Sequence, residues 1–266
     1  MFSIAALRAF PLALLALLAA CGGPREARYA RPPAATPALL LDHGWIAVRE
    51  GGPERSMLEA AGFRFAPTIN EHVGQGTASA TVEFENGFFE LIWADDDVPA
   101  SGTAAIARTR FASRADWRSS GDSPFGIGLR RTAATPSPFP FETWSVASAW
   151  MGEGRSMEVL SPRGSPTVTL FITPEGVDEA ANRAAIAAAG AAAEPFLHAN
   201  GARRITGLRV TAPTRTALPP AASFVNLSGA AELRVGAEWL MELELDHGAQ
   251  NQELDLRPRL PLVVRY

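Results

Sequence analysis

The stretch from residue 41 to residue 96 of this 266-residue chain contains two of its four histidines and a glutamate inside an otherwise apolar strand. His43 stands in the apolar run LLLDHGWIA, and Glu90 stands between Phe89 and Leu91. A carboxylate on a buried face needs a polar partner or a shifted pKa. A neutral imidazole and a carboxylate also suit a divalent metal ion with open coordination positions. The alternative is structural: Glu90 pairs with an arginine such as Arg130, and His43 bonds to the backbone.

The stretch from residue 41 to residue 96 must position these side chains. Alternation along its first strand places His43 and Trp45 on one face and Asp42 on the other. Asn86 and Gly87 form a two-residue hairpin signal, because both turn positions favour positive φ. The pattern predicts strands over 39–49, 63–66, 79–85 and 88–94, a helix over 53–62, and a polar loop over 67–76 that contains His72.

The remainder of the chain has a similar sequence of elements, although residue identity between the halves is low. The predicted elements are helices over 104–119 and 174–193, and strands over 124–132, 141–149, 168–172, 205–210, 232–235 and 239–246. The order strand, helix, strand, strand, strand therefore recurs from about residue 167. This repeat rests on element order alone.

The β-α-β-β-β order resembles the glyoxalase-like, or vicinal-oxygen-chelate (VOC), superfamily. The matching features are Asp42-His43, Ala61-Gly62-Phe63, the loop from His72 to Thr77, and Phe89-Glu90-Leu91. The resemblance implies an α+β fold in which paired βαβββ modules form a cupped mixed sheet, as in glyoxalase and bleomycin-resistance proteins. The expected divisions are a lipoprotein signal peptide over 1–20, a flexible tether over 21–38, a first module over 39–98, a connecting helix and strands over 99–166, and a second module with a C-terminal strand over 167–266.

The resemblance also implies a site, because strands one and four of each module often supply metal ligands in this superfamily. Matched positions make His43 and Glu90 the ligands of a divalent metal, with Glu90 as the candidate catalytic residue. Glu242 could serve on strand four of the second module, but the strand over 168–172 has no histidine. His72 could fill that gap if its loop folds over the cavity, or it could be a solvated loop residue. The residues expected to line the pocket are Trp45, Gln75 and Trp93.

The N-terminus predicts a membrane anchor. Residues 1–20 have one arginine followed by about a dozen apolar residues, which is too short to span a bilayer and fits a signal peptide. The only cysteine, Cys21, follows Leu-Ala-Ala, and this arrangement resembles a bacterial lipoprotein signal. The resemblance implies a lipidated Cys21 that holds the protein on the periplasmic side of the cell envelope, with the outer membrane favoured by Gly22.

Composition excludes several classes of function. The chain has no lysine, so lysine nucleophiles and Schiff bases are excluded, and one cysteine cannot form an intrachain disulfide. The net charge of −4 argues against a nucleic-acid partner. Two hypotheses stay open: a metal-dependent lyase, isomerase or dioxygenase acting on a small oxygenated substrate, and a non-catalytic small-molecule-binding or structural envelope lipoprotein.

Overall fold

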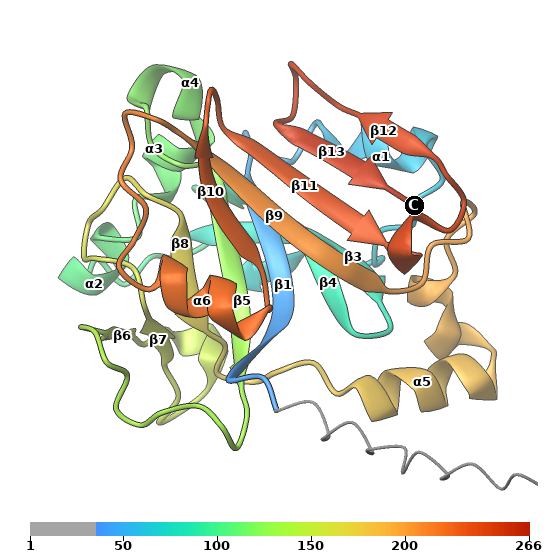
Figure 1. Ribbon diagram of the computed structural model, residues 1–266, viewed down its shortest axis with the longest axis horizontal. Coiled ribbons are helices and arrows are strands. Elements are labelled where there is room, and N and C mark those ends of the chain that lie inside the picture. The colour runs from blue at the N-terminus through green and yellow to red at the C-terminus, as the bar shows by residue number, and fades with distance from the viewer. Residues whose placement is uncertain (1–35) are drawn as a thin grey trace, which may run out of the picture. The chain divides into compact units, whose positions relative to one another are not determined.

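Two β-sheets organise the part of the chain that the computed structural model describes, which is residues 36–266 (Figure 1). The larger sheet has eight strands in the order β2-β3-β4-β1-β5-β8-β7-β6, and the smaller has five in the order β10-β9-β11-β13-β12. The α+β class and the curved mixed sheet are therefore as predicted. The predicted signal peptide, Cys21 and most of the predicted tether lie outside the described residues.

The elements have the following bounds. The strands are β1 (Leu39–Ala47), β2 (Asn70–His72), β3 (Thr77–Phe84), β4 (Gly87–Ala94), β5 (Phe125–Arg131), β6 (Trp144–Val146), β7 (Met157–Val159), β8 (Thr169–Ile172), β9 (Ile205–Pro213), β10 (Glu232–Gly236), β11 (Leu240–Leu245), β12 (Glu253–Asp255) and β13 (Leu262–Arg265). The α-helices are α1 (Arg55–Ala60), α2 (Ala104–Ala107), α3 (Phe111–Ala115), α4 (Trp117–Ser120), α5 (Glu179–Ala188) and α6 (Ala222–Ser228). Three short 3₁₀ helices are η1 (Ala149–Met151), η2 (Ala191–Phe196) and η3 (Asp246–Gly248).

The larger sheet consists of two halves with the same internal order. In the first half, β1 pairs in parallel with β4, and β3 lies antiparallel between β4 and β2. In the second half, β5 pairs in parallel with β8, and β7 lies antiparallel between β8 and β6. The halves join through the antiparallel pair β1 and β5 at the centre of the sheet. The second half has no α-helix between β5 and β6.

This arrangement corrects the predicted place of the second module. The strand expected to open that module at 168–172 is β8, which pairs with β5 and β7 and completes the larger sheet. The second half of that sheet therefore begins at Phe125, and the residues from Ile205 onward build the separate five-stranded sheet. The prediction placed the repeat too late because short β6 and β7 lie among proline-rich loops and give weak periodic signals.

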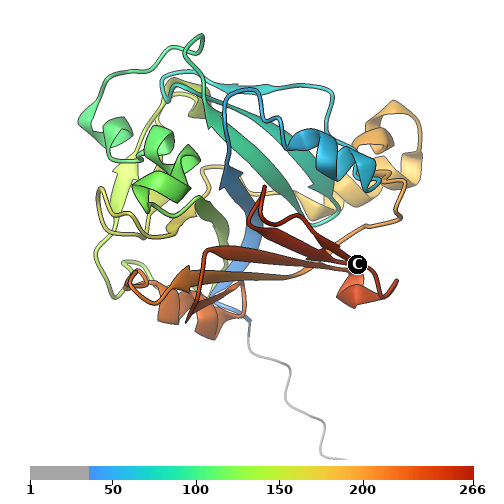
Figure 2. The ribbon, with the colours of Figure 1, turned by 90° about the horizontal axis from the view of Figure 1, so that it is seen from above.

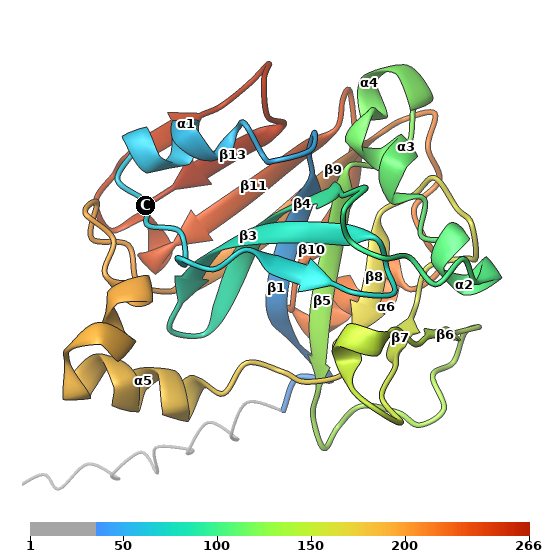
Figure 3. The ribbon, with the colours of Figure 1, turned by 180° about the vertical axis from the view of Figure 1, so that it is seen from behind.

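The two sheets pack through one hydrophobic core. Ile46 and Leu91 from the larger sheet join Leu208 and Met241 from the smaller sheet in this core. Gly44 on β1 makes the approach close, since a methyl group there would lie 3.2 Å from Leu208. Figure 2 shows the smaller sheet on one face of β1. Figure 3 shows the molecule from the opposite side, where β3 and β4 of the larger sheet lie in front. The other face of β1, which carries His43, contributes Trp45 and Ala47 to a second, separate hydrophobic cluster.

The helices depart from their predicted lengths. The helix predicted over 104–119 is three short helices, broken before α3, where Arg110 adopts a left-handed φ of 63°, and again at Asp116, whose φ of −98° and ψ of 35° are not helical. The helix predicted over 174–193 is α5 alone, capped by the Asp178 carboxylate, which accepts the Ala180 and Ala181 N–H groups. Residues 173–178 therefore precede the helix, and they line the cavity described in the next subsection. No helix within residues 36–266 is both long enough and apolar enough to cross a bilayer.

Candidate functional site

A cavity of about 730 Å³ lies against the larger sheet on the face away from the smaller sheet. A second hydrophobic cluster forms its apolar wall, with Trp45, Ile92, Trp144 and Phe171 among the buried members. The other lining residues include polar groups from β1, β2, β3 and β4. These strands contribute Asp42, His43, Asn70, Glu71, His72, Thr81, Glu83 and Glu90, and the loop between β2 and β3 adds Gln75. Arg108, Arg114 and Arg155 line other parts of the cavity. The cavity therefore has an apolar wall and one acidic, imidazole-rich end.

Asp42 and His43 form a buried hydrogen-bonded pair at that end. Alternation predicted opposite faces for them, but the register between β1 and β5 shifts between Leu41 and His43. This irregularity brings the Asp42 carboxylate to His43 Nδ1 at 2.7 Å. An ionised carboxylate only accepts hydrogen bonds, so the network places the proton on Nδ1. His43 Nε2, on the other side of the ring, is directed toward Glu90 in the cavity.

Glu90 lies between two imidazoles without a hydrogen bond from any residue between 36 and 266. Its Oε2 is 3.9 Å from His43 Nε2, and its Oε1 is 3.8 Å from His72 Nε2. The side chain is buried, with a residue exposure of 6%. Because the Glu90 carboxylate is an acceptor that no neighbouring group satisfies, the space between it and the two imidazoles suits a cation, a proton or a ligand donor. The arrangement is an acceptor-rich cavity floor.

His72 lies in strand β2, not in the predicted loop, and it points to the same floor. Its Nδ1 is 2.9 Å from Thr77 Oγ1, which also accepts a hydrogen bond from Gln75 Nε2 at 2.8 Å. Burial lowers the pKa of His72, against a raising effect of Glu90 and with a further lowering effect of His43. His72 is therefore neutral at pH 7. The buried Gln75 Oε1 has no hydrogen-bond partner within residues 36–266 and adds one more acceptor.

Two glycines of β5 make room for the β1 side chains. A methyl group on Gly128 would lie 2.6 Å from His43 Nδ1, and one on Gly126 would overlap the Trp45 indole. The His43 ring also stacks on Phe88, with centroids 4.1 Å apart. Glycine at these positions thus lets the two rings lie flat across the neighbouring strand.

Glu83 on β3 is a cavity residue that the sequence analysis missed. The pKa of Glu83 is raised, mainly by burial, and the nearby Glu90 and Asp42 raise it further. A hydrogen bond from Thr81 and the nearby His43 oppose this shift without reversing it. The alternating pattern of β3 could have revealed it, because Thr81 and Glu83 lie on the same face. Asp42 was also missed as a partner, since strict alternation directed it away from His43.

Two predicted site residues lie elsewhere. Glu242 is on β11 in the smaller sheet, where its carboxylate accepts hydrogen bonds from Arg234 at 2.7 Å and Arg265 at 2.8 Å. Trp93 lies in the core shared by the two sheets, and its Nε1 donates to Asp95 at 3.1 Å. Glu242 was misassigned because β11 belongs to the smaller sheet and not to a second module of the larger one. Trp93 was misassigned because its side chain lies on the face of β4 that packs into the core. Trp45 and Gln75 do line the cavity.

The structural alternative for the predicted pair is also corrected. Arg130 does not approach Glu90; its Nε lies 3.4 Å from Asp42 Oδ2, and its Nη2 donates to Glu179 at 3.1 Å. His43 bonds to the Asp42 carboxylate and not to the backbone. Arg130 therefore belongs to the network behind His43.

The donor types suit a divalent ion, although their spacing is wide. No group of three or more His, Cys, Asp or Glu side chains within residues 36–266 is arranged to hold a metal ion. Ligands at about 2.1 Å from a tetrahedral ion lie about 3.4 Å from one another, so the 3.8 and 3.9 Å separations exceed this by about half an ångström. The unpartnered Gln75 oxygen, the Glu90 carboxylate and two imidazoles nevertheless form a chemically suitable donor set.

Comparisons with known proteins give no family for this chain. No protein-family model matches it, and no curated protein matches it. Among solved structures, the crystal structure of a hypothetical protein from Staphylococcus aureus is similar, with a TM-score of 0.47 and 8% sequence identity, over 85% of this chain and 98% of that chain. A likeness this distant supports no argument about the site.

Proposed function

We propose that this chain is a glyoxalase-like enzyme that binds a small oxygenated molecule in the cavity and acts on it at Glu90. The observation that carries the proposal is the buried Glu90 carboxylate, which lies 3.9 Å from His43 Nε2 and 3.8 Å from His72 Nε2 and has no hydrogen bond from the described residues. Such an arrangement of acceptors costs stability unless a cation or a proton-donating ligand occupies it. Sites of this kind are typical of function, not of packing.

The strand order supports the family assignment within this proposal. Each half of the larger sheet has the order two, three, four, one, and the two first strands meet at the centre. This is the arrangement implied by paired βαβββ modules of the VOC superfamily, with the helix missing from the second half. Fold alone does not select an activity, so the activity is argued from the site.

His43, His72 and Glu90 are the residues that would hold a divalent ion. When bound, the ion would polarise an oxygen of the substrate. Asp42 holds the His43 ring through Nδ1, so that Nε2 is directed at the cavity. The neutral state of His72 leaves its imidazole available to coordinate or to exchange a proton.

Glu90 is the proposed proton acceptor. Its position between two imidazoles lets it take a proton from a ligand held against the apolar wall. Trp45 and Phe171 lie on that wall and exclude water from the reacting group. Proton abstraction next to a substrate oxygen is compatible with lyase, isomerase and dioxygenase reactions, which differ in the later steps.

Two substitutions separate the roles of Glu90. Glu90→Gln retains an oxygen ligand but cannot accept a proton, whereas Glu90→Ala loses both. Equilibrium dialysis with Zn²⁺ should give one ion per wild-type chain, a weakened site in Glu90→Gln and none in Glu90→Ala or His43→Ala. Glu244→Gln, on the smaller sheet, is the matched control. Wild-type protein that retains no ion would remove the metal from this proposal.

Catalysis is tested by proton exchange on small hydroxyketones and 1,2-dicarbonyl compounds. Proton NMR in D₂O should show deuterium incorporation that depends on wild-type protein and is lost in Glu90→Gln. Exchange at equal rates in both proteins would contradict the role of Glu90 as base.

A second candidate, non-catalytic binding of a small molecule, is favoured by the second half of the sheet. In the first half, the paired strands β1 and β4 bring Trp45 opposite Glu90. In the second half, the paired strands β5 and β8 bring Gly128 opposite Phe171. The second half thus adds no imidazole or carboxylate from these two strands to the floor. Ligand binding without exchange or metal retention would select this candidate.

The N-terminal sequence supports a lipid anchor at Cys21 as part of the same proposal. Anchoring would place the cavity on the periplasmic face of the envelope, with access to small molecules there. A lipid bilayer and a small-molecule ligand are the proposed partners.

A further inference from the structure

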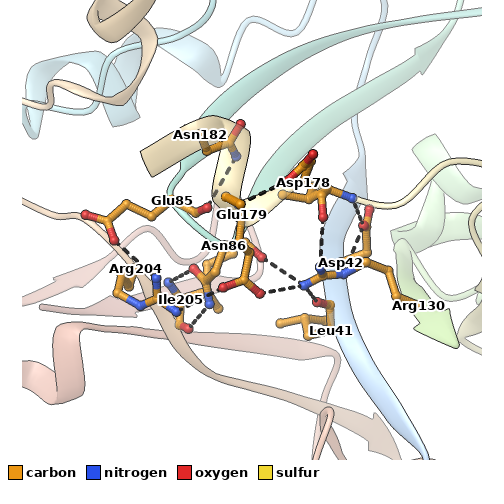
Figure 4. A network of polar contacts seen from close by, with 12 residues as sticks. Leu41, Asp42, Glu85, Asn86, Arg130, Asp178, Glu179, Asn182, Arg204 and Ile205 are labelled. Carbon is orange, nitrogen blue, oxygen red and sulfur yellow. Dashed lines mark hydrogen bonds and ion pairs between the residues drawn. The ribbon is translucent and has the colours of Figure 1, made fainter. Parts of the chain in front are cut away.

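A polar network behind His43 joins three elements that are distant in sequence. Figure 4 shows Arg130 reaching from β5 toward Leu41 and Asp42 on β1 and toward Glu179 at the start of α5. Its Nη2 donates to the Leu41 carbonyl at 3.0 Å, and its Nη1 donates to the Val177 carbonyl at 2.8 Å. The guanidinium is therefore held on several sides.

The same network holds the Asp42 carboxylate. Asp42 Oδ1 accepts from His43, and Oδ2 accepts the Val177 N–H at 2.7 Å. Arg130 Nε lies 3.4 Å from Oδ2, and its positive charge compensates a carboxylate whose side chain is 2% exposed. Arg130 and Val177 thus fix both the position and the charge of the group that orients His43.

We infer that Arg130 is a positioning residue, which acts through Asp42 to direct His43 Nε2 at the cavity. The 173–178 segment shares this role, because its backbone contributes the Val177 N–H and carbonyl while the segment also lines the cavity. The position of the loop along the cavity and the orientation of the imidazole are therefore coupled. This inference rests on the proposed function of the cavity, but the His43 geometry can be measured without metal or substrate.

Gly176 gives a second means of displacing the guanidinium. A methyl group there would lie 2.7 Å from Arg130 Cγ and 3.5 Å from Asp42 Oδ2. Gly176→Ala therefore displaces Arg130 while keeping every charge. Arg204 provides the control, because it pairs with Glu179 at 3.4 Å and with Glu85 at 3.1 Å but does not contact Asp42.

The experiment compares Arg130→Gln, Gly176→Ala and Arg204→Gln with wild type. Nitrogen-15 NMR of the histidine rings reports whether His43 carries its proton on Nδ1 and whether that proton is protected by a hydrogen bond. We expect a protected Nδ1 proton in wild type and Arg204→Gln, and its loss in Arg130→Gln and Gly176→Ala. Arg130→Lys should restore part of the signal. Dispersed amide spectra in each variant confirm folding.

Zn²⁺ affinity gives a separate readout. Loss of a group that orients a metal-binding histidine lowers affinity by about 10–100-fold, and we expect that loss in Arg130→Gln but not in Arg204→Gln. If Arg204→Gln changes His43 as much as Arg130→Gln does, Arg130 only anchors α5 and the inference is wrong. An unchanged His43 signal in both Arg130→Gln and Gly176→Ala overturns it as well. Wild-type protein that binds no Zn²⁺ but keeps the protected proton would refute the metal proposal alone.

Discussion

Gly128→Ala perturbs the site where β5 contacts the His43 ring. The new methyl group would lie 2.6 Å from His43 Nδ1, about 0.8 Å inside ordinary van der Waals contact, and β5 is held by β1 and β8 on both sides. The His43 ring must therefore move away from Asp42, which accepts its hydrogen bond at 2.7 Å. The substitution should break that bond or lengthen it beyond hydrogen-bonding distance.

The expected cost follows from two opposing effects. Overpacking a filled site costs about 1–3 kcal/mol, and replacing glycine in the unfolded chain returns about 0.4–1 kcal/mol. A net loss of about 1–2 kcal/mol lowers the melting temperature by about 2–8 °C in a domain of this size. Differential scanning calorimetry measures that shift, and Zn²⁺ affinity should fall at least tenfold.

Gly44→Ala is the matched control for this prediction. It lies on β1 beside His43, but its methyl group would meet flexible ends of Leu208 and Met241 in the other core. It should lower stability without changing the His43 Nδ1 proton. If Gly128→Ala melts at the wild-type temperature and keeps that proton, the close packing of His43 on β5 is refuted.

Three further predictions concern the anchor and the pH dependence of stability. Cys21→Ala should abolish incorporation of labelled fatty acid in a bacterial host and release the protein from membranes; unchanged labelling contradicts the lipoprotein assignment. His198 Nδ1 accepts the Arg64 N–H at 3.1 Å, and its Nε2 donates to the Glu83 carbonyl. Burial lowers the pKa of His198 in the folded protein, so the imidazole takes up a second proton more readily in the unfolded chain. The free energy of unfolding should therefore fall as pH drops from about 7 to 5, and chemical denaturation of His198→Asn should show a smaller fall; an equal fall would assign the effect elsewhere. Burial opposes ionisation of Glu242, but the hydrogen bond from Arg265 and the charges of Arg234 and Arg209 lower its pKa overall. The ionised carboxylate therefore stabilises the fold above about pH 4.5, and this stabilisation is lost as the pH falls through the lowered pKa. Glu242→Gln should flatten the acid limb of the stability curve without changing Zn²⁺ affinity.

Local pattern was sufficient for β1, β3 and β4 in the first half of the larger sheet, but the strand predicted over 63–66 does not form, and β2 lies in the predicted loop. Alternation correctly put His43 and Trp45 on one face of β1. A tight turn does join β3 to β4 as predicted, but its two residues are Glu85 and Asn86, because Gly87 already pairs with Phe84, and neither Asn86 nor Gly87 has a positive φ. These features depend on neighbours in sequence. The register shift at Asp42 depends on pairing with β5, which is more than eighty residues away, and no local signal specifies it.

Long-range pairing also explains the errors in the second half. The apolar strand 169–172 has the same local character whether it begins a module or ends one, and only its pairing with β5 decides. Glu242 was likewise indistinguishable from a cavity ligand until three arginines from β9, β10 and β13 were found around it. The sequence could not reveal which strands share a sheet.

We propose that His43, His72 and Glu90 together bind a cation at the cavity floor. Anomalous diffraction from crystals soaked in Zn²⁺ tests it directly. We expect one strong peak within coordination distance of His43 Nε2, His72 Nε2 and a Glu90 oxygen, and we expect that peak to be absent in Glu90→Ala crystals. A peak at another surface only, or no peak in the wild-type cavity, would contradict it.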